Sequence, residues 1–179
     1  MDAIVEAALR KWPNVPHCYG WLALDARGDW YLRDAQVQAA GPFPLPKGSR
    51  IEHDGLLGFI GRNYAADARG CWFFQNGPQR VYVELEAAPW VWRLAPGAPC
   101  RVHTHTGLQA RPIAAWLDEN GRLFLECDRG LGLVHSLDTE LAADALERGE
   151  WPLQELRFDA LPARFGYVLR PQPQPQPQA

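Results

Sequence analysis

The segment Asp67–Glu86, DARGCWFFQNGPQRVYVELE, determines the fold that we predict for the chain around it. Aromatic and β-branched residues dominate 71–75 and 80–86, which predicts two strands. Between them, Asn76-Gly77-Pro78 predicts a turn, because glycine adopts positive φ without strain and proline restricts φ. Apolar and polar side chains alternate along 80–86, so one face of this strand is expected to be apolar. The segment therefore predicts a β-hairpin.

The composition is that of an ordinary soluble globular protein, with 47% hydrophobic and 22% charged residues. A chain of 179 residues is long enough for one sizeable core or for two small subdomains. The net charge of −3 offers no basic surface for nucleic acid, so we expect no nucleic-acid partner.

The cysteines indicate a reducing compartment. All four are far apart and form no CxxC pair, which argues against a zinc ribbon or a redox motif. The first residues, MDAIVEAALRKW, lack the apolar core of a signal peptide, and the sequence contains no apolar run of membrane-spanning length. We therefore predict a cytoplasmic protein with reduced thiols and no membrane contact.

Hydrophobic periodicity predicts three helices among short strands. Helices are expected before Pro13, over 54–66 with Asp54 as N-cap, and over 137–148 with Ser136 as N-cap. A loop rich in proline and glycine is expected over 41–48. Further strands are predicted over 19–24, 30–33, 90–94, 101–105, 113–117, 122–127, 156–158 and 166–169.

An internal repeat is visible in the sequence. DARGDW at 25–30 and DARGCW at 67–72 are nearly the same hexapeptide, with weaker similarities at 118–123 and 147–151. In each half a hairpin leads to a histidine, His53 or His135, then to a helix and a Gly-x-Trp sequence. The repeat predicts duplication. Convergence is the alternative, because Asp-x-x-Gly is favourable turn chemistry wherever it occurs.

These patterns predict an α+β fold. It consists of two related β-rich repeats of antiparallel hairpins, each with one helix, packed into one compact assembly. The expected parts are an N-terminal helix and loop over 1–18, a first repeat over 19–95, a second repeat over 96–170, and a disordered Pro/Gln tail over 171–179.

Two runs of the sequence carry a family resemblance. RNYAADARGCWFFQNGPQRVYVELEAAPWVW and KWPNVPHCYGWLALDARGDWYLRD resemble a proteobacterial family of conserved proteins of unknown function, over about residues 10–150. The order of elements, with Val83, Glu84, Pro89 and Trp90 as a loose signature, is also similar to a second uncharacterised bacterial family of two structural repeats. That likeness implies a signalling or ligand-sensing role.

An aromatic and amide cluster is the candidate ligand site. Stacking faces beside an arginine and amide groups suit a small planar or anionic ligand, or a partner's hot spot. The alternative is that these aromatics fill the junction between the repeats. The candidate residues are Trp72, Phe74, Asn76, Gln79, Arg80, Tyr82, Trp90 and Trp92.

A metal site is the second hypothesis. His103 and His105 lie at i and i+2, so on a strand both imidazoles point to one face, and His135 would be a third ligand. The spacing resembles the first cupin motif, but Gln109 stands where that motif has a glutamate, a poorer ligand for a divalent cation.

The sequence contains no recognisable catalytic constellation. Glu84 and Glu86 share one strand face, and alternation with apolar residues predicts that this face is solvated. We therefore predict a non-enzymatic module that binds a small molecule or a protein partner, with a regulatory or signalling role and no cofactor. The alternatives are a cupin-like metal-dependent enzyme, or a structural protein whose exposed tryptophans form a homo-oligomer contact.

Overall fold

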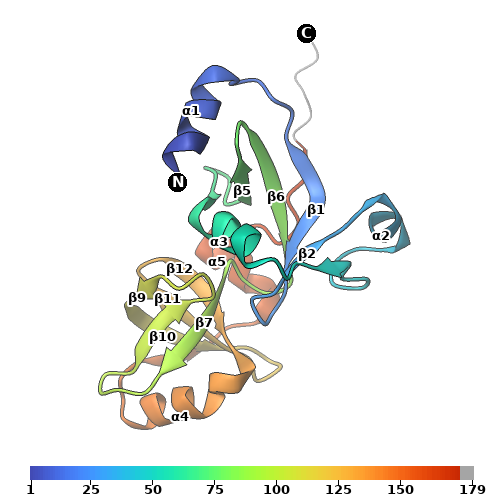
Figure 1. Cartoon of the computed structure of the whole chain (residues 1–179). Coiled ribbons are helices and arrows are strands. Elements are labelled where there is room, and N and C mark those ends of the chain that lie inside the picture. The colour runs from blue at the N-terminus through green and yellow to red at the C-terminus, as the bar shows by residue number, and fades with distance from the viewer. Residues whose placement is uncertain (174–179) are drawn as a thin grey trace. The chain divides into compact units, whose positions relative to one another are not determined.

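A computed structural model describes residues 1–173 and has a mixed α+β fold with two curled β-sheets (Figure 1). The chain divides into two compact units, and neither is continuous in sequence. The first unit contains residues 1–24, 30–85 and the C-terminal segment from Val168, and the second contains 25–29 and 86–167. The predicted boundary between 95 and 96 differs from this division, because the strand that begins at Trp90 pairs within the second sheet.

The first unit contains a six-stranded sheet and three helices. The strand order is β3-β2-β1-β6-β5-β4. Its strands are β1 (Cys18–Leu24), β2 (Trp30–Leu32), β3 (Ser49–Arg50), β4 (Tyr64–Ala66), β5 (Trp72–Asn76) and β6 (Gln79–Leu85). Its helices are α1 (Ala3–Lys11), α2 (Ala35–Ala40) and α3 (Asp54–Arg62).

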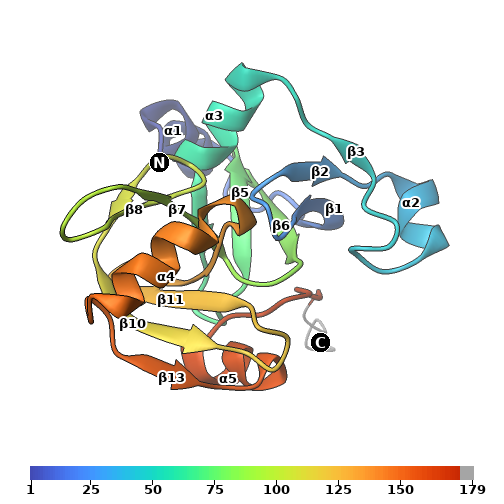
Figure 2. The same ribbon diagram turned by 90° about the horizontal axis from the view of Figure 1, so that it is seen from below.

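The second unit contains a seven-stranded sheet in the order β13-β10-β11-β12-β7-β8-β9, with α4 running alongside it (Figure 2). Its strands are β7 (Trp90–Ala95), β8 (Arg101–Thr104), β9 (Gln109–Ala110), β10 (Pro112–Leu117), β11 (Leu123–Cys127), β12 (Gly130–Val134) and β13 (Leu153–Glu155). Its helices are α4 (Thr139–Glu147), α5 (Leu161–Phe165) and the 3₁₀ segments Ser136–Asp138 and Phe158–Ala160.

The hairpin predicted from the opening segment is present as β5 and β6. The two strands are antiparallel, and Asn76 pairs with Gln79 across the turn, where Gly77 has a φ of 56°. The alternation predicted for the second strand holds only in part. Val83 and Leu85 are buried, but so is Glu84, which forms an ion pair with the buried Arg33 instead of facing solvent.

The two sheets share one topology. In the first, the meanders β1-β2-β3 and β4-β5-β6 are joined by parallel pairing of β1 with β6. In the second, the meanders β7-β8-β9 and β10-β11-β12 are joined by parallel pairing of β7 with β12. The parallel pairings complete mixed sheets, whereas the sequence predicted only antiparallel hairpins. This correspondence places the turn after Asp118 where the first sheet has the turn after Asp67.

The Asp-x-x-Gly sequences form the same turn three times. In each, the aspartate Oδ1 accepts hydrogen bonds from the backbone N–H groups two and four residues later. The glycine N–H donates to the aspartate carbonyl, and the glycine φ is 83°, 76° or 72°. The aspartates are Asp25, Asp67 and Asp118. The repeated sequence is therefore a structural element that closes strand connections.

One predicted helix end and two predicted N-caps need correction. The helix predicted over 54–66 ends at Arg62, because the residues from Tyr64 form β4 and pair with β5. Its N-cap is His53, not Asp54, since His53 Nδ1 accepts from the N–H of Leu56 at 3.1 Å. In the second unit Nδ1 of His135, not Ser136, accepts from a backbone N–H, at the start of the 3₁₀ segment before α4.

The C-terminal part also differs from the prediction. The closing strands predicted over 156–158 and 166–169 are absent from the described residues, where β13 lies over 153–155 and α5 follows. Backbone hydrogen bonds from Val168 to Gly70 and from Leu85 to Leu169 instead tie the segment after α5 to the first unit. Of the predicted tail, residues 174–179 lie outside the described residues, and Pro171 is buried.

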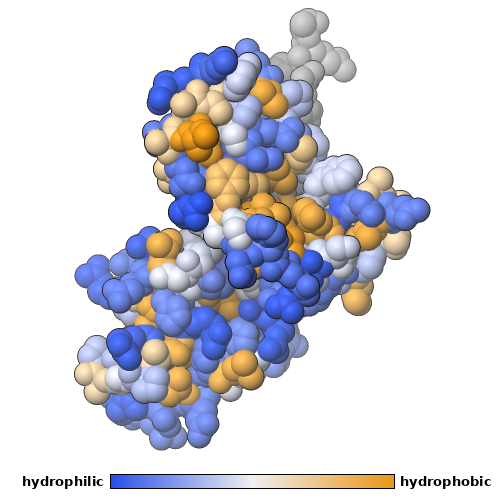
Figure 3. All heavy atoms as spheres, viewed as in Figure 1, coloured by the Kyte–Doolittle hydropathy of each residue, from blue (hydrophilic) through white to orange (hydrophobic). Residues whose placement is uncertain are grey.

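Each unit has its own apolar core. Leu24 and Val83 are fully buried in the first unit, and Trp92, Phe124 and Leu125 in the second. On the face drawn in Figure 3, hydrophilic residues predominate and apolar side chains appear in small groups. All four cysteines are free thiols. No helix within residues 1–173 has both the length and the apolar character of a membrane span.

Candidate functional site

A cavity of about 620 Å³ lies in the first unit, beside the first residues of β1 and β6. Its aromatic and charged lining consists of two tyrosines, two arginines, one histidine and one aspartate. These residues are Tyr19, Tyr82, Arg69, Arg80, His17 and Asp67.

Parallel pairing of β1 with β6 brings four of these side chains together. Cys18 pairs with Val81, so the residues on either side of each belong to the same sheet face. The neighbours of Cys18 are His17 and Tyr19, and those of Val81 are Arg80 and Tyr82. The turn between β4 and β5 adds the aspartate and the second arginine.

The two tyrosine rings form the centre of the site. Tyr19 and Tyr82 stack with centroids 4.5 Å apart and an interplanar angle of 9°. His17 approaches the edge of Tyr82 at 5.9 Å, and the Arg69 guanidinium lies 5.7 Å from the centroid of the same ring. Arg80 lies over Phe73 at 4.4 Å. Tyr82 is buried at 3% exposure and Tyr19 is half-buried, so Tyr19 and the guanidinium groups supply the part of the site that a planar anion can contact.

Among the described residues, Asp67 supplies the carboxylate that lines the cavity, and it has no free oxygen for a ligand. Oδ1 of Asp67 accepts from the N–H groups of Arg69 and Cys71 at 2.9 and 3.0 Å. Its Oδ2 accepts from the Arg69 guanidinium at 3.0 and 3.1 Å and from the Tyr82 hydroxyl at 3.0 Å. Burial alone would raise the pKa of Asp67, but these hydrogen bonds outweigh it and lower that pKa. The aspartate therefore stays ionised and holds Arg69 in place.

The remaining charge in the cavity is positive. No carboxylate within residues 1–173 forms an ion pair with Arg80. The pKa of His17 is lowered by partial burial, and further by the positive charges of Arg80 and Arg69. An anion bound between these groups would favour the protonated imidazole. The cavity thus combines aromatic surface with a positive potential.

The other predicted residues of this hairpin have different environments. Trp72 is half-buried with its ring 4.7 Å from Tyr64, and Phe74 is buried against Phe59 at 5.4 Å. Asn76 is exposed at the turn. Gln79 donates from Nε2 to the carbonyl of Pro16 at 2.8 Å. Of the predicted cluster, Arg80 and Tyr82 line the cavity.

The two remaining tryptophans lie in the second unit. Trp90 and Trp92 are 5% and 0% exposed, which makes them core residues. Their indole N–H groups donate to the carbonyls of Arg129 and Leu125, each at 2.8 Å. The indole donors of this pair are therefore satisfied within the core.

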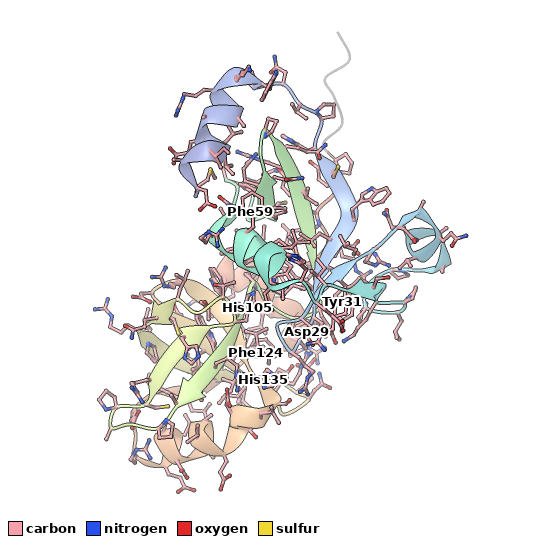
Figure 4. All side chains as sticks on the ribbon, in the orientation of Figure 1. Asp29, Tyr31, Phe59, His105, Phe124 and His135 are labelled. Carbon is pink, nitrogen blue, oxygen red and sulfur yellow. The ribbon has the colours of Figure 1, made fainter. Side chains whose placement is uncertain are left out.

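The three histidines of the metal hypothesis have separate surroundings, and two of them, His105 and His135, are labelled in Figure 4. His103 lines a cavity of about 750 Å³ beside Cys100 and Trp151. His105 Nδ1 accepts from the N–H of Val91 at 3.2 Å, and burial lowers its pKa to about 3, against the opposing charge of Asp25. His135 caps a helical turn through Nδ1. No group of three or more His, Cys, Asp and Glu within residues 1–173 is arranged to hold a metal ion.

Sequence reasoning missed four of the six aromatic and charged residues of the cavity. His17 and Tyr19 precede the hairpin by about sixty residues, and their partners are reached only through parallel pairing. Asp67 and Arg69 belong to the segment 67–86, but their Asp-x-x-Gly sequence predicted a turn and gave no indication of a binding role. The i, i+2 spacing of His17 with Tyr19, and of Arg80 with Tyr82, is the one local signal that both pairs share.

The comparisons with known proteins identify the family of the chain and give one solved structure with partial similarity. The DUF2944 family, described as "Protein of unknown function (DUF2946)", matches residues 1–172, which confirms the predicted resemblance to a family of unknown function. No curated protein matches the chain. A crystal structure of a DUF1285 family protein from Shewanella baltica has a TM-score of 0.49 and 15% identity, covering 70% of this chain and 91% of that chain.

Proposed function

Because the chain belongs to the DUF2944 family, whose function is unknown, we propose from its own side chains that it is a non-enzymatic module that binds a small planar anion. One observation carries this proposal. The stacked Tyr19–Tyr82 pair is bordered by Arg69, Arg80 and His17, while the nearby carboxylate is saturated by hydrogen bonds. Tyr82 is 3% exposed, so an aromatic carboxylate, sulfate or phosphate would contact the half-buried Tyr19 and receive charge-assisted hydrogen bonds from the guanidinium groups.

The proposed role is regulatory, and the proposed location is the cytoplasm. Four free thiols without a disulfide suit a reducing compartment. We also propose that the two units arose by duplication, since both sheets use two three-stranded meanders joined by a parallel pair. Only the first unit carries the tyrosine and arginine set, so the two copies would have diverged in function.

Phenyl sulfate is a suitable probe, because it is planar and aromatic and its charge is constant over the pH range in which histidine titrates. We expect it to bind the full-length protein in calorimetric titration. Arg80→Gln should weaken binding at least tenfold, since a charge-assisted hydrogen bond contributes about 1.5–3 kcal/mol. Arg10→Gln, on the exposed face of α1, is the matched control and should bind normally. Equal affinity of both variants would exclude this cavity as the site.

The pH dependence of the same titration provides a second readout. His17 has a lowered pKa in the free protein, and a bound anion favours its protonated form. Affinity should therefore rise as the pH falls through the pKa of His17, with uptake of a proton on binding. His17→Gln should bind with an affinity that does not change over this range. If the affinity of His17→Gln rises in acid as much as that of the unmodified protein, His17 does not face the anion.

A further inference from the structure

A second, chemically different groove lies in the second unit. It has a volume of about 500 Å³ and is bounded by α4, by β10, β11 and β12, and by the turn that contains Arg27. Four leucines line it, with Leu117, Leu123 and Leu133 from the sheet and Leu146 from the helix. This volume lies within the range of small-molecule sites.

Small residues on α4 leave the groove open. Ala142 and Ala145 are fully buried and face the core. Thr139, Ala143 and Leu146 recur at helical spacing and line the groove, and Ala143 is exposed. Because alanine fills little space, Leu117 and Leu123 of the sheet remain partly exposed beside the helix, whereas Leu133 is buried. The groove is thus a space that an apolar chain can occupy.

Polar groups gather at the edge formed by the turn. The Arg27 guanidinium donates to the Ser136 hydroxyl at 3.3 Å. No carboxylate within residues 1–173 forms an ion pair with Arg27, and Thr139 adds a second hydroxyl. The other arginine of the groove, Arg122, is bound by Asp118 at 2.7 Å. Arg27 is therefore the arginine of the groove that has no carboxylate partner among the described residues.

We propose that this groove binds a medium-chain fatty acid. The alkyl chain packs between α4 and the leucines of the sheet, where each buried methylene contributes about 0.8 kcal/mol. The carboxylate binds Arg27 and the hydroxyl of Ser136, because the Thr139 hydroxyl already donates to the Ser136 carbonyl. A guanidinium without a carboxylate partner beside the leucines distinguishes an acid from an alcohol of the same length, because only the acid pairs its negative charge with the positive charge of the guanidinium. This site is separate from the anion site proposed for the first unit.

Titration of the full-length protein with decanoate tests the proposal. We expect saturable binding at one site, at least tenfold weaker binding of decanol, and no detectable binding of butyrate, whose chain is too short to fill the groove. Arg27→Gln should weaken decanoate binding about tenfold and leave decanol binding unchanged. Equal affinities of decanoate and decanol, or equal decanoate affinity of Arg27→Gln and the unmodified protein, would overturn the role of Arg27.

Filling the groove is the second test. Ala143→Phe places a ring in the groove from an exposed position, so the fold should be retained, and decanoate binding should be lost. Ala163→Phe, on an exposed position of α5, is the matched control and should bind decanoate normally. Phenyl sulfate should bind Ala143→Phe as it binds the unmodified protein, which separates failure of this proposal from failure of the anion site. Decanoate binding that survives Ala143→Phe would show that the acid binds elsewhere.

Discussion

At the scale of single residues, the turn carboxylates contribute more to the molecule than their surface sequences indicate. The side chain of Asp118 is fully buried and accepts from the N–H groups of Asn120 and Arg122 at 2.9 and 2.8 Å. It also receives the Arg122 guanidinium at 2.7 Å. Burial of a carboxylate is tolerated only when such donors replace water.

We predict that Asp118→Ala lowers the free energy of unfolding by about 2 kcal/mol, because two backbone donors and a guanidinium lose their acceptor. Asp118→Asn should lower it by about half as much, since the amide oxygen still accepts from the backbone. Urea denaturation at neutral pH measures both. Asp144→Asn, an exposed aspartate of α4, is the control and should change little.

The same carboxylate gives a defined pH dependence. Burial alone would raise the pKa of Asp118. Hydrogen bonds from the Arg122 N–H, the Arg122 guanidinium and the Asn120 N–H outweigh this effect, so the pKa lies below its usual value of 3.8. A lowered folded-state pKa contributes stability above the unfolded-state pKa, and this contribution is lost as the pH falls through the folded-state value. The difference in the free energy of unfolding between the unmodified protein and Asp118→Asn should therefore become smaller in acid. A constant difference would contradict this assignment.

At the scale of elements, close contact between β12 and β7 depends on one glycine. Gly132 pairs with Trp90 in the parallel register. A Cβ atom at Gly132 would lie 2.5 Å from Nε1 of Trp92 and 2.8 Å from Cβ of Trp90. Since Trp92 is fully buried, its ring has no free space into which it can move.

Gly132→Ala should therefore destabilise the protein by about 1–3 kcal/mol, the usual cost of overpacking a core. Gly58→Ala in α3 is the matched control. Its Cβ would meet only the flexible end of Arg62 at 3.2 Å, so it should stabilise the helix by up to about 1 kcal/mol. Thermal unfolding of both variants measures the contrast. Equal melting temperatures would contradict the packing argument.

At the scale of the whole molecule, neither unit can be cut from the chain as one piece. The turn 25–29 connects two strands of the first sheet but belongs to the second unit. There the Ala26 N–H donates to a carboxylate oxygen of Glu86 at 3.1 Å. A Cβ atom at Gly28, where φ is 83°, would lie 2.8 Å from Cβ of His105. The turn is therefore closely packed within the second unit.

We predict that replacing residues 25–29 with an Asn-Gly turn leaves the β1–β2 hairpin closed but destabilises the second unit. Two-residue Asn-Gly turns suit antiparallel hairpins, so the first sheet keeps its connection. Amide hydrogen exchange should become faster in β7 and β8 than in β5 and β6. Equal acceleration in both sheets would show that the turn is not a specific part of the second unit.

The candidate anion site was predictable only in part. Arg80 and Tyr82 belong to a strand whose pattern is clear in the sequence, and their polar and aromatic character indicates binding. His17 and Tyr19 have no comparable signal, because their place beside β6 depends on a parallel pairing across some sixty residues. Trp90 and Trp92 were predicted for the site but lie in the core of the second unit. The local sequence pattern does not distinguish a buried indole from one that faces a ligand.

The sequence by itself determined the local structure of this protein. It specifies the hairpin around Gly77, the Asp-x-x-Gly turns and the first helix. Side-chain alternation, glycine φ, hydrogen bonds from the backbone to turn aspartates, and the apolar stripe of a helix all act over a few residues. Only the tertiary structure decided that β1 lies parallel to β6, that Glu84 is buried against Arg33, and that the turn 25–29 belongs to the second unit. Such pairings depend on the burial of surfaces that are distant in sequence, and no local pattern encodes them.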